Sequence, residues 1–299
     1  MRRQDATPAG DEAAALYSIH APRDVLRPFV RRLMAADTDL PEETVVRVAP
    51  TGYNYMGWHA QGRSRVLVDG EPADYGEFHF AGQLRGQWVE VVHSGHLTHI
   101  IAEFTATGLM RLIHVPGSAI VGRPTPVAKV SPNCARALSP LPSLAAGSVQ
   151  ARVGAFQDVL CGLVDEAEPP IEHLEQAVSM IECASGLVRI AEVCRTLGIS
   201  QRHLARTFTD VVGIGPKYFA KVVQLNTTLG ALLSGDREQI TSLAHDFGYS
   251  DHAHIVHVMR ELLRMGPTTF LDSHDYVLAT FLARSQAPRT EPNRPSKVS

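Results

Sequence analysis

The chain contains one pattern of residues twice, first over residues 190–200 (IAEVCRTLGIS) and again over residues 240–250 (ITSLAHDFGYS). In each copy the apolar residues lie at spacings of three and four, which places them on one face of a short helix. A glycine, Gly198 or Gly248, follows the last apolar residue, where a helix ends most easily in the left-handed conformation. The serine two residues later can cap a second helix. A pattern repeated in this way predicts two copies of one structural element.

Each copy predicts two short helices joined by a turn, the helix-turn-helix unit whose second helix can enter the major groove of DNA. Both copies continue into a second amphipathic stretch and close on a proline, Pro216 or Pro267, that is followed by an aromatic residue. The alternative interpretation is a pair of ordinary helical hairpins in an all-helical core. Because the turn and proline positions match between the copies, the repeat favours the helix-turn-helix interpretation.

These residues resemble the DNA-binding domain of the AraC family of bacterial transcription regulators. The resemblance covers about residues 171–273, and its most family-like segments are residues 198–208 (GISQRHLARTF) and 248–254 (GYSDHAH). It implies an all-helical domain with two helix-turn-helix units, over residues 188–212 and 238–264, joined by one long bridge helix.

Residues 216–234 fit this bridge helix, with Pro216 at the first helical position and Gly235 as the stop. At about 1.5 Å per residue, such a helix is about 28 Å long. That length is close to the roughly 34 Å between successive major-groove turns on one side of DNA. The resemblance therefore implies two recognition helices that reach successive major grooves.

The register of the resemblance also assigns residues to the DNA interface. In the first unit these residues are Gln201, Arg202, His203, Ala205 and Arg206. In the second unit they are Asp251, His252, Ala253, His254, His257 and Arg260. We expect the two arginines of the first unit to carry most of the sequence discrimination, because a guanidinium group can pair with both O6 and N7 of guanine.

The second unit departs from the family pattern. Arg264 stands where the family usually has the glycine of the closing turn, so the helix must end without that glycine. Ile255 and Met259 stand where the family usually has two phenylalanines of the core. His257 stands where the family often has an arginine that reads a base, and Gln224 of the bridge stands where basic residues are usual. The formal net charge is −3, so the non-specific attraction of the whole chain to the DNA backbone is weak.

The N-terminal part shows the pattern of β structure. Short runs rich in β-branched and aromatic residues alternate with turn residues, which is typical of a sandwich or a small barrel. The runs are residues 44–48, 53–58, 65–68, 76–80, 87–92 and 97–104. A looser resemblance over residues 21–130, to a β-rich domain found ahead of some AraC-type DNA-binding domains, implies that this part senses a ligand or dimerises.

The expected fold class is therefore α+β with two domains, a β-sandwich or barrel-like N-terminal domain and an all-α double helix-turn-helix domain. We expect the first over residues 16–168 and the second over residues 169–285, with disordered tails at 1–15 and 286–299. Within the first domain we expect helices over residues 23–32, 107–114 and 144–164 and a proline-rich loop over residues 124–142.

Four aromatic residues of the expected strands, Tyr53, Tyr55, Trp58 and Trp88, are candidates for the lining of a ligand pocket. Ordinary sandwich core is the alternative interpretation of the same residues. If they line a pocket, the first domain takes a small-molecule effector.

The 14 histidines raise the question of a metal site. His93, His96 and His99 are closely spaced, but in an extended chain only His93 and His99 share a face, and with Glu103 they match a metal site only in part. A histidine on a half-buried strand is more often hydrogen-bonded than bound to metal, so we expect no metal and no other cofactor. Nucleophile-elbow, P-loop and dinucleotide motifs are absent, so we do not expect an enzyme.

Two classes of function remain open. The first is a sequence-specific transcription regulator, of activator type, that binds promoter or operator double-stranded DNA under the control of its effector or dimerisation domain. A small-molecule effector, RNA polymerase and a second copy of the chain are its further candidate partners. The alternative is a ligand-binding or metal-dependent enzymatic β domain that carries a degenerate helix-turn-helix interaction module. Without a long apolar run or a secretory leader, we expect a cytoplasmic protein that does not enter the membrane.

Overall fold

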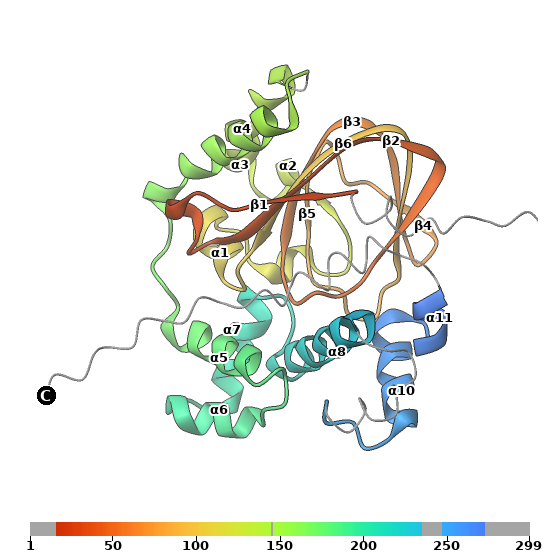
Figure 1. Cartoon of the computed structure of the whole chain (residues 1–299). Helices are drawn as coiled ribbons and strands as arrows, with labels where there is room; N and C mark the ends of the chain where they lie inside the picture. The colour runs from red at the N-terminus through yellow and green to blue at the C-terminus, as the bar shows by residue number, and fades with distance from the viewer. Residues whose placement is uncertain (1–15, 145, 235–246, 273–299) are drawn as a thin grey trace, which may run out of the picture.

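The computed structural model describes residues 16–144, 146–234 and 247–272. It has two parts, a curled β-sheet with flanking helices above and a group of helices below (Figure 1). We call them the β domain (residues 16–168) and the helical domain (residues 169–272). The expected fold class, a β-rich N-terminal domain followed by an all-α one, is confirmed.

Seven strands of the β domain form one sheet in the order β1-β2-β6-β3-β5-β7, with β4 paired to β3. Their bounds are Ser18–His20 (β1), Val30–Val48 (β2), Tyr55–Val68 (β3), Glu71–Ala73 (β4), Phe78–Ala81 (β5), Val89–Phe104 (β6) and Thr125–Pro126 (β7). Every strand pair is antiparallel. The long strands β2, β3 and β6 bend strongly (Figure 1), and register shifts near residues 40–44 and 59–63 mark β-bulges, which increase local bending.

The alternation of side chains along the strands gives the sheet two different faces. One face carries Trp58, which is fully buried and stacks on Phe156 of helix α4 (Val149–Cys161) with ring centroids 6.5 Å apart. The neighbouring residues Gly57 and His59 lie on the opposite face, which lines a cavity. The same strands therefore build a helix-covered core and a cavity wall.

Two expected helices of the β domain are confirmed and one is wrong. Helix α1 (Gly108–Ile113) and helix α4 lie within the expected ranges, and the hydroxyl of Ser148 caps α4 by accepting a hydrogen bond from the N–H of Ala151 at 3.2 Å. The helix expected over residues 23–32 is instead a single 3₁₀ turn, Asp24–Leu26, followed by β2. The β2 pairing with β6 begins at Val30, so tertiary hydrogen bonds override the local helical pattern there.

The loop expected over residues 124–142 is also wrong, because most of this segment is helical. It contains β7, helix α2 (Val127–Val130), helix α3 (Pro132–Leu138) and the 3₁₀ turn Leu141–Leu144. Pro132 occupies the first turn of α3, where its missing N–H has no helical partner to lose. Short 3₁₀ turns also form at Gly117–Ile120 and Val164–Glu166.

The helical domain consists of two packed groups joined by the long helix α8. Its described helices are α5 (Glu172–Cys183), α6 (Ile190–Leu197), α7 (Gln201–Val211), α8 (Pro216–Ser234), α10 (His252–Leu263) and α11 (Pro267–Asp272). Helices α5, α6 and α7 share one core with the first part of α8, and α10 and α11 share another with its second part. Helix α8 has the bounds expected for the bridge, whereas residues 235–246, with the first helix expected for the second unit, lie outside the described residues.

The two domains touch through polar and apolar contacts. The side-chain amide of Asn226 on α8 donates to the carbonyl of Thr51 at 3.1 Å, and the guanidinium of Arg85 donates to the carbonyl of Gly213 at 2.7 Å. Ala49 packs into the core shared by α8 and α10. The turn between β2 and β3 is therefore the place where the sheet meets the bridge helix. In the described part of the chain, no helix has the length and apolar character of a membrane span.

Candidate nucleic-acid interface and the cavity of the β domain

The first helix-turn-helix unit forms as its sequence predicts. Helix α6 ends at Leu197, and Gly198 takes the left-handed conformation with φ of 66°. The hydroxyl of Ser200 then accepts a hydrogen bond from the N–H of His203 at 3.1 Å and so caps α7. This local geometry fixes the angle at which α7 leaves the turn.

Helix α7 buries one face and leaves the expected DNA-facing residues outside. Leu204 and Phe208 are fully buried. On the other face Gln201, Arg202, Ala205 and Arg206 are exposed, and His203 is half-buried. The two arginines lie one helical turn apart, so both guanidinium groups project from the same exposed face.

A groove beside α7 adds basic residues that the sequence analysis did not single out. It lies between α6, α7 and α8, next to Gln201, and its walls include Arg189, Lys217 and Lys221. Lys221 also contacts the carboxylate of Glu261 on α10. Arg189 and Lys217 stand at the starts of α6 and α8, and only the packing of these helices brings them to one groove.

Helix α10, the helix expected to be the second recognition helix, begins at an acidic cap. The carboxylate of Asp251 accepts a hydrogen bond from the N–H of His254 at 2.8 Å, and this bond is the main cause of the lowered pKa of Asp251. Ile255 and Met259 are buried in the positions expected for core residues. Asp251, although it is an expected interface residue, therefore has a structural role as well.

The remaining interface residues of α10 differ in their surroundings. His252, Ala253, His257 and Arg260 are exposed. The Nδ1 atom of His254 lies 3.3 Å from the N–H of Ser250, and its ring packs edge-on against Tyr249. His254 is therefore exposed like the others, but its ring is held against its own turn.

Helix α10 ends without a glycine, as expected, and the residue in its place contacts the β domain. Arg264 takes the left-handed conformation with φ of 56°, which costs a non-glycine residue about 1 kcal/mol or more. Its guanidinium donates to the carbonyl of Gly86 at 3.0 and 2.6 Å. Gln224 lies on the bridge, where basic residues are usual in the family that the sequence resembles. Its side-chain amide donates to the carbonyl of Phe247 at 2.7 Å and so holds the turn that precedes α10.

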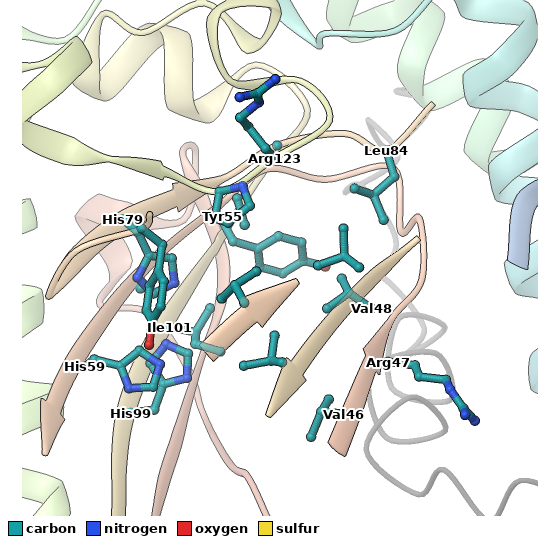
Figure 2. Close-up of a pocket in the computed structure, with 18 of the residues that line it drawn as sticks. Val46, Arg47, Val48, Tyr55, His59, His79, Leu84, His99, Ile101 and Arg123 are labelled. Atoms are coloured by element: carbon teal, nitrogen blue, oxygen red, sulfur yellow. The ribbon is translucent and has the colours of Figure 1, made fainter. Parts of the chain in front are cut away.

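The β domain encloses a cavity of about 140 Å³ on the inner side of its curled sheet (Figure 2). Aliphatic residues from several strands form most of its wall. They include Val46, Val66, Leu84, Val89, Val91 and Ile101. A histidine cluster, which we define as His59, His79, His93 and His99, forms one end.

Three of the four imidazole rings of the cluster lie side by side in Figure 2. The rings of His59 and His99 stack with centroids 4.0 Å apart, and the ring of His79 lies 5.5 Å from that of His99. Burial lowers the pKa of His59 to about 3 and the pKa of His79 and His93 to about 4, and the pKa of His99 is also well below its usual value. At neutral pH the cluster is therefore uncharged.

The sequence analysis found only part of this cluster. His93 and His99 share the inner face, as expected, whereas the ring of His96 points outward to the carboxylates of Asp37 and Asp39, each at 2.9 Å. His59 and His79 were not singled out, because they belong to strands far apart in the sequence. Their proximity depends on the register of β3 with β5 and β6.

Glu103 does not take part in the cluster. It is fully buried, and its carboxylate receives hydrogen bonds from Arg31 at 2.5 Å, Arg32 at 2.8 Å and the hydroxyl of Tyr55 at 3.0 Å. In the described residues, no three His, Cys, Asp or Glu side chains are arranged to hold a metal ion.

Of the four aromatic residues considered for a ligand pocket, Tyr55 lines the cavity. Tyr53 donates from its hydroxyl to Glu182 of α5 at 2.6 Å, Trp58 belongs to the helix-covered core, and Trp88 stacks with Arg47. The alternation of side chains explains this separation for Trp58, since it follows Gly57, which faces the cavity.

Comparison with known proteins found one family match and several solved structures of low similarity. Residues 193–273 match a family described as a helix-turn-helix domain. Among solved structures, ToxT from Vibrio cholerae is similar over 80% of this chain and 98% of its own, with 8% identity and a TM-score of 0.47. The AraC-like transcriptional activator CuxR is similar over 71% of this chain and 86% of its own, with 16% identity and a TM-score of 0.24. No curated protein matches the chain.

The family match covers both segments on which the resemblance to AraC-type regulators rests, residues 198–208 and 248–254. The structure gives the first of these segments the expected turn and cap. Behind its β-rich N-terminal domain, the chain therefore carries a segment that matches a helix-turn-helix domain family, in the region where the sequence resembles AraC-type regulators.

Proposed function

We propose that this protein is a transcription regulator that places two helix-turn-helix units in successive major grooves, under the control of an effector bound in the cavity of its β domain. The division into an effector domain over residues 16–168 and a DNA-binding domain over residues 169–285 is part of the proposal. The observation that carries it is the direct contact between the wall of the cavity and the bridge helix α8.

The first unit supplies the main DNA contacts. Arg202 and Arg206 are exposed on one face of α7, which is the arrangement needed for bidentate contacts with guanine. Arg189 and Lys217 in the adjoining groove are positioned to neutralise backbone phosphates. This side of the molecule therefore combines base reading with phosphate binding, although the chain as a whole is acidic.

The second unit contributes fewer positive charges. Arg260 is exposed, but Glu261 lies beside His257 and contacts Lys221. We infer that α10 positions the protein on the next major groove and discriminates less strongly between bases than α7 does.

The effector acts on the DNA-binding domain through the turn between β2 and β3. The hydroxyl of Tyr55, a cavity residue, lies 2.7 Å from that of Thr51, and the carbonyl of Thr51 accepts the hydrogen bond from Asn226 of α8. Ala49 lines the cavity and also packs into the core of α8 and α10. A ligand that displaces this wall must therefore also act on the element that sets the spacing of the two units.

The test is DNA binding by the full-length protein. Duplexes selected from a random pool by the purified protein serve as the operator, and fluorescence anisotropy gives the dissociation constant at several salt concentrations. We expect selective binding over a scrambled duplex and a linear fall of log affinity with log salt. Absence of any selected duplex contradicts the proposal and favours the alternative, an effector or enzymatic β domain with a degenerate interaction module.

A further inference from the structure

The histidine cluster leaves several buried nitrogen atoms without a hydrogen-bond partner. They are Nδ1 of His59, Nδ1 of His79 and Nε2 of His99. The His79 and His99 side chains are more than nine-tenths buried, and an unmet buried polar atom costs about 1–3 kcal/mol. A bound group that pairs with these atoms would remove this cost.

The position of His99 shows where the missing group belongs. The hydroxyl of Tyr17 lies 2.9 Å from Nδ1 of His99 and so fixes the ring, leaving Nε2 for a different partner. Gly57 lets the rings of His79 and His99 pack directly against the strand backbone, because a Cβ atom there would lie 2.8 Å from Nε2 of His99 and 2.5 Å from Nε2 of His79. The rings are therefore held close together at the end of the cavity.

The chemistry of neutral imidazole favours a hydroxyl group as that partner. A neutral ring presents one N–H donor and one acceptor, and the tautomer decides which is which. A hydroxyl group both donates and accepts, so it can pair with either tautomer. It also fits beside a cluster in which no ring bears a charge at neutral pH.

A charged ligand suits this cluster poorly. Burial lowers the pKa of His79 to about 4, so at pH 7 about one His79 ring in a thousand is protonated to meet an anion. The guanidinium of Arg123 is directed away from the imidazoles (Figure 2), and that of Arg47 contacts Glu90. A metal ion would require the rings to rotate first, since no three donors among the described side chains are arranged to hold one.

The size and lining of the cavity define the rest of the ligand. Its volume of about 140 Å³ is close to that of an engineered apolar cavity of about 150 Å³ that binds benzene. Most of the remaining wall is aliphatic, with Val46, Val91 and Ile101 among its residues. One six-membered ring fits this space, and a long acyl chain does not.

We propose that the cavity binds a neutral monocyclic aromatic alcohol, a phenol, with its ring between the aliphatic residues and its hydroxyl group on the imidazoles of His79 and His99. This inference deepens the effector part of the proposed function and rests on it. It does not depend on DNA binding, so it can fail or hold independently of the helix-turn-helix units.

Isothermal titration of the full-length, DNA-free protein at pH 7.5 tests the ligand class with four probes: phenol, toluene, benzoate and zinc chloride. We expect phenol to bind with one site per chain and toluene to bind at least about fivefold more weakly, since about fivefold is the value of one of the two hydrogen bonds that toluene lacks. Benzoate and zinc should bind at least tenfold more weakly than phenol. Tighter binding of benzoate, of zinc or of toluene, or no binding of phenol, overturns the inference.

Two pairs of variants locate the site. Val46→Phe should abolish phenol binding because Val46 lines the cavity. Val45→Phe should not, because Val45 is exposed on the other face of the strand. His79→Phe removes one of the two imidazoles and should reduce the difference in affinity between phenol and toluene without weakening toluene. His96→Gln, outside the cavity, should preserve that difference. If the affinity for phenol is unchanged in Val46→Phe or in His79→Phe, phenol binds elsewhere and the inference is wrong.

Discussion

Single residues give the two recognition helices different charges. Helix α7 exposes Arg202 and Arg206, with Gln201 before them and Ala205 between them. Helix α10 begins at a carboxylate, Asp251, and carries one exposed arginine. We therefore expect base reading to be concentrated in the first unit.

We predict that Arg202→Ala and Arg206→Ala each reduce specific DNA affinity by about 1–3 kcal/mol and relax discrimination at one base pair. Fluorescence anisotropy with the selected operator and with single-base variants of it measures both effects. His257→Ala, the matched change on α10, should cost less. The assignment is wrong if both arginine variants bind like wild type while His257→Ala abolishes binding.

Acid should destabilise the β domain through the histidine cluster. The pKa of His79 falls from about 6.5 in the unfolded chain to about 4 in the folded one, because burial disfavours the charged ring. Below pH 6.5 the unfolded chain binds a proton that the folded chain does not, so stability falls between about pH 6.5 and 4 and is unaffected above that range. The contribution of this residue reaches about 3 kcal/mol at the acid end.

Urea unfolding at pH 7.5, 6 and 5, followed by circular dichroism, measures this loss, because the first pH lies above the range between the pKa values of about 6.5 and 4 and the other two lie within it. His79→Phe should lose less stability on acidification than wild type. His96→Gln, whose ring lies outside the cavity, should retain the acid-induced loss. Equal pH profiles for wild type and His79→Phe would show that the buried ring is not the cause.

Among the elements of the fold, the turn of the first helix-turn-helix unit depends on one glycine. Gly198 has a positive φ, and a Cβ atom added there would meet no other atom within 4 Å. The effect of a side chain at this position is therefore a backbone effect alone.

We predict that Gly198→Ala destabilises the helical domain by about 1 kcal/mol. Gly154→Ala is the matched control, because a Cβ atom on Gly154 of α4 also meets nothing within 4 Å but the residue lies inside a helix. That change should stabilise the protein by about 0.5–1 kcal/mol. Chemical denaturation of the two variants should give shifts of opposite sign, and shifts of the same sign would contradict this explanation.

The elements also show what sequence patterns reveal and what they do not. The cap, the turn glycine and Pro216 are local signals, and they predicted where α7 begins and both bounds of α8. The pairing of Val30 with β6 is not local, and it replaced an expected helix with a strand. His59 and His79 became neighbours through strand register and bulges, which the spacing of histidines along the chain cannot reveal.

At the scale of the whole molecule, the β domain and the helical domain share the turn between β2 and β3. One end of this turn lines the cavity, and its backbone accepts a hydrogen bond from α8. Arg264 adds a second contact, from the end of α10 to Gly86. The two domains are therefore arranged so that the cavity and the bridge helix can influence one another.

Filling the cavity should change the affinity for DNA. We predict that Val46→Phe shifts operator affinity at least about fivefold, the lower end of typical coupling free energies, and that Val45→Phe does not. Asn226→Leu, which removes the hydrogen bond to Thr51, should reduce the shift caused by Val46→Phe. Equal DNA affinities for the two valine variants would indicate that the cavity and the DNA-binding domain are uncoupled.

The central claim, that two helix-turn-helix units bind successive major grooves, is tested most directly by a hydroxyl-radical footprint of the full-length protein on its selected operator. The account predicts two protected regions on one side of the duplex, about 10 base pairs apart from centre to centre. Arg206→Ala should weaken the protection of one region first. A single protected region that disappears entirely with Arg206→Ala, or uniform protection without sequence preference, would contradict the account.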